Sequence, residues 1–146
     1  MELILRIFHD LTQVHPPHTL FVHFPIALVS AALFFILLAL WRKSKILEQV
    51  AFANTALAAV STIVTLFFGI RDNSVFYNGG APNHIAKIIL ASTLFVLTTI
   101  TSIARWQNKD LFYSKTTKAL YVAVYFVNFA IVSVLGFLGG IILFGG

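Results

Sequence analysis

The chain has no cysteine, and its only methionine is Met1. The lack of cysteine excludes structural disulfides, thiolate zinc sites, iron–sulfur clusters and the CxxCH attachment of c-type haem. Any metal or haem held by this chain must therefore be bound by histidine, carboxylate or main-chain oxygen. A haem would be of the b type, with two histidine ligands.

Charged residues are also scarce, because they make up 10% of the 146 residues, whereas 59% are hydrophobic. Soluble domains are about 25% charged. The apolar residues form four long blocks rather than the amphipathic stripes of a water-facing helix. This composition predicts an integral membrane protein. The five acidic residues, none expected deep in a span, supply no carboxylate pair for acid–base catalysis, so we do not expect an enzyme acting on its own.

Four blocks are long enough to cross a bilayer: residues 20–41, 50–70, 85–104 and 119–144. Each supplies the roughly 20 residues that cross about 30 Å of hydrocarbon. Because each backbone amide needs an internal partner in lipid, these spans must be helices. We therefore expect a single membrane domain over residues 1–146. Its fold would be an all-α, up-and-down bundle of four transmembrane helices.

The lysine and arginine residues of the short loops predict the orientation. Two loops carry most of them: Arg42, Lys43 and Lys45 after the first span, and Arg105, Lys109, Lys115 and Lys118 after the third. By the positive-inside rule, both loops are cytoplasmic and both termini lie on the outer, periplasmic side of a bacterial inner membrane. This distribution accounts for the net charge of +5 without nucleic acid as a partner.

Residues 1–14 form a short amphipathic segment before the first span. Its apolar residues share one helical face: Leu3, Ile4, Ile7, Phe8 and Leu11. That spacing predicts an interfacial helix, which either lies flat on the outer membrane surface or packs against a partner subunit. The sequence leaves both alternatives open.

Histidine is the residue type that points to function, since ionisable side chains within a membrane are rare and usually face a bundle interior or a cavity. His15 and His18 flank two prolines where the first span begins, and His23 lies inside that span. His84 begins the third span, directly after Asn83, a good N-cap residue. All four would lie near the outer face.

The spacing of the spans favours a haem between His23 and His84. The first and third spans are diagonal in an up-and-down bundle, at roughly 11 to 14 Å. Two histidines that ligate one haem iron need a backbone separation of roughly 12 Å. Pro25 frees the carbonyl of Phe21 and is expected to kink the helix beside His23.

Other residues at the same depth suit a haem pocket. Arg71 and Lys87 would neutralise the haem propionates. Gly136 and Gly140, in the outer third of the fourth span, either open a groove for a flat cofactor or allow close helix packing. Both interpretations of the glycines remain open at this point.

Several motifs resemble a family of bacterial membrane proteins that is grouped as domain of unknown function 2231. The resemblance covers nearly the whole chain and rests on His15-Pro16, the segment LFVHFPIAL at 20–28, Gly69-Ile-Arg-Asp72, His84 and Gly136-Phe-Leu-Gly-Gly140. It implies a four-helix membrane module, sometimes found beside redox domains such as Rieske proteins, and hence an electron-transfer setting. The chain departs from the family in its additional His18 and in its wholly apolar residues 141–144, where members commonly carry a polar residue and an aromatic.

These observations lead to one main hypothesis and two alternatives. The main hypothesis is a small cytochrome b-like subunit that passes electrons between a quinol or a periplasmic cytochrome and a larger membrane redox complex. The first alternative is a cofactor-free accessory subunit, whose apolar helices pack against larger membrane partners. The second is a copper or zinc site on the outer face, formed by His15, His18 and His84.

Overall fold

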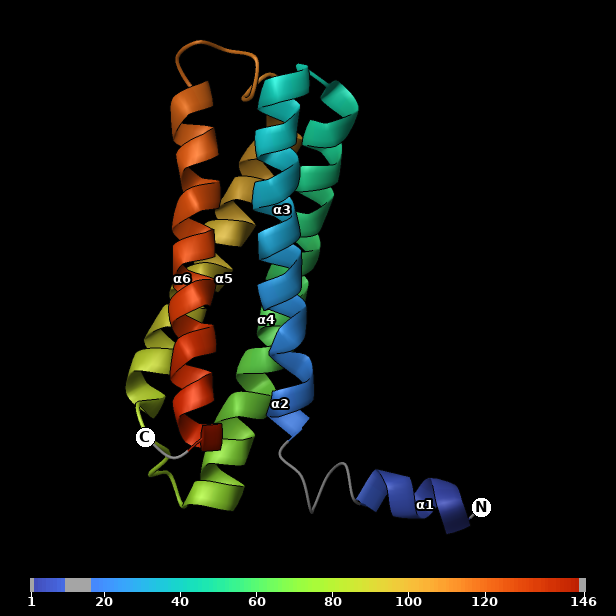
Figure 1. Ribbon diagram of the computed structural model, residues 1–146, viewed down its shortest axis with the longest axis vertical. Helices are drawn as coiled ribbons and strands as arrows, with labels where there is room; N and C mark the ends of the chain where they lie inside the picture. The colour runs from blue at the N-terminus through green and yellow to red at the C-terminus, as the bar shows by residue number, and fades with distance from the viewer. Residues whose placement is uncertain (1, 10–16, 145–146) are drawn as a thin grey trace.

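The computed structural model describes residues 2–9 and 17–144, and its regular structure in these ranges is entirely helical (Figure 1). Two short helices, α1 (Glu2–His9) and α2 (Pro17–Phe21), precede four long ones: α3 (His23–Arg42), α4 (Lys45–Tyr77), α5 (His84–Gln107) and α6 (Lys118–Phe144). The four long helices, with α2 continuing into α3, are long and apolar enough to cross a membrane. The predicted all-α fold with four transmembrane helices is confirmed.

The long helices extend beyond the spans predicted from hydropathy. The largest difference is in α4, which has 33 residues and is therefore about 50 Å long. Hydropathy detects only the segment that matches the hydrocarbon layer, whereas the helix continues through polar residues on both sides of it. This extension brings Glu48 into α4 at one end and Asp72 and Asn73 at the other.

The four long helices form an up-and-down bundle. Helix α3 packs against α4 and α6, and α5 packs against the same two helices, so α3 and α5 are diagonal as expected. The α3–α4 and α5–α6 connections lie at one end of the bundle (Figure 1). This end, which we call the basic end, carries six exposed cationic side chains: Arg42, Lys43, Lys45, Lys109, Lys115 and Lys118.

A buried polar cluster joins three helices near the basic end. It consists of Glu48, Arg105, Tyr121 and Tyr125, and we call it the Glu48 cluster. Arg105 donates two hydrogen bonds to the Glu48 carboxylate, at 2.5 and 2.7 Å, and the Tyr121 hydroxyl donates a third at 3.0 Å. The hydroxyls of Tyr121 and Tyr125 are 2.9 Å apart. The cluster thus links α4, α5 and α6 by charge-assisted hydrogen bonds.

This cluster corrects two expectations. Arg105 was expected to be a loop cation, but it lies inside α5 and is 5% exposed. Glu48 was expected outside the spans, but it lies inside α4 and is 0% exposed. The physical reason is mutual compensation, since each charge tolerates burial because the other is within hydrogen-bond distance.

The first span is interrupted at Val22, between α2 and α3. Pro25 has no amide hydrogen, so it cannot donate to the carbonyl of Phe21. That carbonyl instead accepts a hydrogen bond from the Thr65 hydroxyl of α4, at 3.1 Å. The break predicted beside His23 is therefore confirmed, and it leaves α2 packed against α4.

Helix α1 runs across the bundle axis rather than along it, at the end opposite the basic loops (Figure 1). Its side chains Leu3, Ile4 and Leu5 are exposed. The predicted interfacial helix over residues 1–14 corresponds in the structure to α1, Glu2–His9. Residues 10–16, and with them His15, lie outside the described residues.

Candidate functional site

A cavity of about 710 Å³ lies among the helices at the end opposite the basic loops, and α2 to α6 all contribute to its wall. Four polar side chains of the wall come from three different helices: His18 of α2, Asn73 of α4, and His84 and Lys87 of α5. Apolar side chains such as Leu94 and Leu135 line it toward the middle of the bundle. A cavity of this size, whose wall combines apolar and polar side chains, suits a cofactor-sized ligand.

His18 is fixed on one wall of the cavity by α4. Its backbone N–H donates to Asp72 Oδ2 at 2.8 Å, and its ring Nδ1 lies 3.1 Å from the carbonyl oxygen of Thr65. Because a carbonyl only accepts, Nδ1 must carry the proton, which leaves Nε2 as an acceptor. The ring packs on Gly69, where an added Cβ would lie 3.0 Å from Nδ1.

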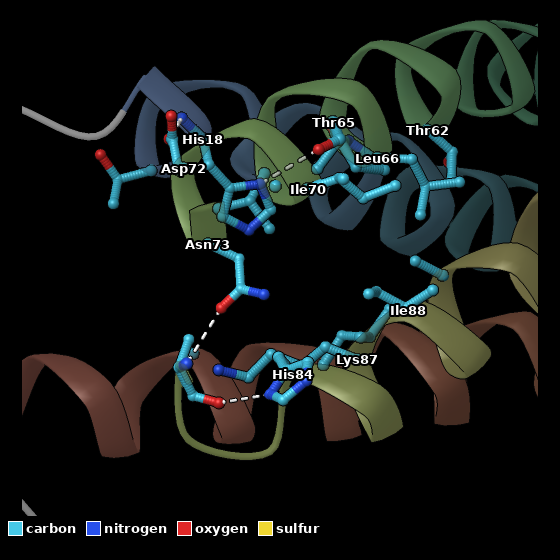
Figure 2. Close-up of a pocket in the computed structure, with 18 of the residues that line it drawn as sticks. His18, Thr62, Thr65, Leu66, Ile70, Asp72, Asn73, His84, Lys87 and Ile88 are labelled. Atoms are coloured by element: carbon cyan, nitrogen blue, oxygen red, sulfur yellow. Dashed lines mark hydrogen bonds between the residues drawn. The ribbon is translucent and has the colours of Figure 1, made fainter. Parts of the chain in front are cut away.

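His84 lies on the opposite wall and is held in the same tautomer. Its Nδ1 lies 2.8 Å from the carbonyl oxygen of Ala81, so its Nε2 is also left as an acceptor. Asn73 of α4 supports this turn, because its side-chain oxygen accepts from the backbone N–H of Ala81 at 2.9 Å. Figure 2 shows the side chains of His18 and His84 on opposite walls, with Asn73 between them.

The turn before His84 differs from the expected helix cap in one respect. Asn83 occupies the N-cap position of α5, as predicted, but its side chain makes no capping hydrogen bond. Its backbone instead adopts a left-handed conformation, with φ of 56°. Asparagine tolerates this conformation better than most residues, which accounts for its presence there.

The structure brings most of the predicted site residues to this one cavity. His18, His23, His84 and Lys87 line it, together with Gly136 and Gly140. His23 is exposed, and its Nδ1 lies 2.7 Å from the Thr19 carbonyl of the preceding turn. Arg71 is not part of the wall, and its guanidinium instead pairs with Asp72 at 3.0 Å.

The glycines of α6 widen the cavity rather than allowing close helix packing. An added Cβ at Gly139 or Gly140 would meet no described atom within 4 Å, and one at Gly136 would lie 3.8 Å from Ile26 Cδ1. Close packing of the GxxxG type requires a neighbouring backbone where these side chains are missing. Of the two interpretations of these glycines, the groove is therefore the one that fits.

A site in which three or more side chains hold one metal ion finds no support in the described part of the chain. Within residues 2–9 and 17–144, no group of three or more His, Cys, Asp or Glu residues is placed to hold a metal ion. The copper or zinc site predicted at His15, His18 and His84 depends on His15, which is outside these ranges.

The family model described as predicted membrane protein (DUF2231) matches residues 14–144. The chain belongs to this family. No curated protein and no solved structure matches the chain. The DUF2231 match includes the Glu48 cluster and all residues that line the cavity, whereas α1 precedes it.

Three residues that shape the site of this DUF2231 protein were not assigned these roles from the sequence. Thr65, Gly69 and Asn73 follow one another on α4 at intervals of four residues, so they share one side of the helix. The segment from Gly69 to Asp72 carried the family resemblance, and its glycine was a signal for close approach of another group. The group that approaches is the His18 ring.

Proposed function

We propose that the chain is a small membrane subunit that holds a b-type haem and takes part in electron transfer. The proposal rests on two imidazoles, His18 and His84, which lie on opposite walls of one cavity and each have Nδ1 against a main-chain carbonyl. A hydrogen bond from Nδ1 to a carbonyl is typical of metal-ligating histidine, because it fixes the tautomer and leaves Nε2 to the metal. The Nε2 atoms of His18 and His84 would hold the iron of a b-type haem.

The cavity has further features that suit a flat, carboxylate-bearing ligand. The glycines of α6 leave a wall without side chains, which accommodates a planar ring. Lys87 lies one turn from His84 on α5, lines the cavity, and would pair with a propionate. The Asn73 amide nitrogen would add a hydrogen-bond donor. Arg71 would act only indirectly, through its ion pair with Asp72, which holds the backbone of His18.

His18 is a better ligand than His23, the residue favoured from the sequence. Both line the cavity and both have Nδ1 near a carbonyl oxygen. His18, however, is partly buried against α4 and has its main chain held by Asp72, whereas His23 is exposed. A ligand whose orientation is fixed before binding loses less conformational entropy when it binds.

The distribution of charge supports a cellular setting for this function. The six cations of the basic end would face the cytoplasm, and the cavity would then open at the outer face of a bacterial inner membrane. When bound there, a haem supplies a one-electron carrier. The residues of this chain would hold it and exclude water, while a quinol or periplasmic cytochrome and a larger membrane redox complex would be its partners.

The direct test is a pyridine haemochrome assay and a reduced-minus-oxidised spectrum of the protein purified in mild detergent after expression with ample haem. We expect roughly one low-spin b-type haem per chain. A monodisperse, helical protein without haem would overturn the proposal and would favour the cofactor-free accessory subunit.

Gly69 provides a test of how His18 is positioned. In Gly69→Ala, the new Cβ would crowd the His18 ring at 3.0 Å from Nδ1 and displace it from the Thr65 carbonyl. We expect haem affinity to fall about 10- to 100-fold, as for other residues that orient a ligand. Haem titration of the apoprotein measures this. Ser74→Ala is the matched control, because this exposed residue of α4 lies outside the cavity wall and its hydroxyl donates to Ile70 of its own helix, and equal affinities in the two variants would contradict the role of Gly69.

Gly139→Leu tests the groove itself. A leucine side chain there would project into open space, so the helices need not move, but the side chain would occupy part of the cavity. We expect a folded protein of unchanged thermal stability that binds little or no haem. Unaltered haem content in the purified variant would show that the α6 wall is not part of the binding site.

A further inference from the structure

A layer of three buried polar side chains crosses the middle of the bundle. It consists of Thr55 of α4, Thr98 of α5 and Asn128 of α6, which are 2%, 0% and 2% exposed. Each lies seven residues along its helix from a member of the Glu48 cluster: 48 to 55, 105 to 98 and 121 to 128. Seven residues correspond to about 10.5 Å, so the three side chains lie at the same depth. We call them the polar layer.

Asn128 has an unmet hydrogen-bonding requirement. Its side-chain oxygen is fully buried and has no partner among the described residues. The two threonines donate their hydroxyl hydrogens to their own helices, Thr55 to Ala51 and Thr98 to Leu94, and so keep oxygen lone pairs as acceptors. The layer therefore presents several acceptors, and one of them, Asn128 Oδ1, has no donor among the described residues. Native proteins usually satisfy such groups with buried water.

The polar layer lies between the Glu48 cluster and the cavity. On one side, Tyr125 is hydrogen-bonded to Tyr121, and its hydroxyl lies beside Thr55 of the layer. On the other side, a further seven residues lead from Thr55 to Thr62 and from Asn128 to Leu135, and both Thr62 and Leu135 line the cavity. The layer thus lies midway between the Glu48 cluster and the floor of the cavity.

We propose that the polar layer binds buried water, and that this water joins the cavity floor to the Glu48 cluster by hydrogen bonds. Water fits this chemistry because it donates two hydrogen bonds, to Asn128 Oδ1 and to a threonine oxygen, and accepts from the amide of Asn128. The carboxylates that would draw a metal ion are not present at this depth in the described helices. The proposal does not depend on haem, since it concerns side chains below the cavity.

Hydroxyl-radical footprinting with X-ray pulses tests the proposal, because radicals formed from bound water oxidise the side chains beside it. Tyr125 is the reporter, since it is 2% exposed and its hydroxyl lies beside Thr55 of the layer. We expect clear oxidation of Tyr125 in the wild-type protein in nanodiscs and a several-fold decrease in Asn128→Leu. Asn54→Leu is the matched control, because the Asn54 amide donates to Val50 of its own helix at 2.8 Å, and it should oxidise like wild type.

The outcome that overturns the proposal is equal oxidation of Tyr125 in the wild type and in Asn128→Leu, with both proteins folded. Thr98→Val gives a second measurement that does not depend on the folding of the leucine variant. This substitution removes one acceptor of the layer at nearly constant volume and should lower Tyr125 oxidation, whereas an unchanged value would count against bound water.

Discussion

His84→Ala is expected to abolish the haem spectrum of the purified protein while the four-helix bundle remains folded. The imidazole lies in the first turn of α5, where only its Nδ1 makes a hydrogen bond, to Ala81 of the adjoining turn. Its removal therefore breaks a hydrogen bond within the turn that precedes α5 and not one that joins two helices. His18→Ala should lose haem in the same way. Absorption spectra and haem content per chain measure the effect, and circular dichroism and gel filtration confirm the fold.

His23→Ala separates the ligand pair derived from the structure from the pair derived from the sequence. With His18 and His84 as ligands, His23→Ala retains haem, because its ring is exposed and its Nδ1 is hydrogen-bonded within its own helical turn. With His23 and His84 as ligands, this variant loses haem and His18→Ala retains it. Retention of haem in both His18→Ala and His84→Ala would remove the cavity from consideration as a bis-histidine site.

Arg105→Met is expected to destabilise the protein by about 3–5 kcal/mol, because it leaves the Glu48 carboxylate buried without its charged partner. Glu48 is 0% exposed, so water cannot replace the two hydrogen bonds that Arg105 donates. Unfolding in mixed micelles titrated with dodecyl sulfate measures the free-energy change. Lys109→Met, at an exposed cation of the same end, should leave stability almost unchanged.

The double variant Glu48→Met/Arg105→Met distinguishes a buried charge from a loss of packing. With both charges gone, no carboxylate remains unpaired, and we expect most of the stability to return. Tyr121 loses one acceptor but keeps its contact with Tyr125 at 2.9 Å. If the double variant is as unstable as Arg105→Met, the cluster stabilises the bundle through shape rather than through compensation of charge.

The membrane class, the four spans and the break at Pro25 could all be predicted from local sequence. Each depends on interactions within one helix or between a helix and lipid, and these follow from composition and spacing. The burial of Glu48 and Arg105 could not be predicted, because the two residues are 57 positions apart and each looks like a loop charge by itself. Only the packing of α4 against α5 brings them together.

The site could be predicted only in part, because some of its contacts join residues that are far apart in the sequence. His18, His23 and His84 stood out because imidazoles are rare in membranes, and the structure places all three at one cavity. The orientation of His18 depends on Thr65, Gly69 and Asp72, which are 47, 51 and 54 residues away. The spacing within a single helix therefore favoured His23, which lies inside the predicted span, over His18 as the ligand. In the structure, His23 is exposed and His18 is partly buried.

The Glu48 cluster also bears on how the protein matures. It closes the basic end with side chains of this chain alone, and Phe112 of the α5–α6 loop is buried in the apolar core beside it. Assembly of that end therefore needs no ligand, whereas the cavity lies at the opposite end of the bundle. If the protein binds haem as proposed, the helices would insert into the membrane and pack first. The haem would then enter the cavity at the end opposite the basic end. A cell that runs short of haem would then keep the folded apoprotein in its membrane. This apoprotein could bind haem later, without new synthesis of the chain.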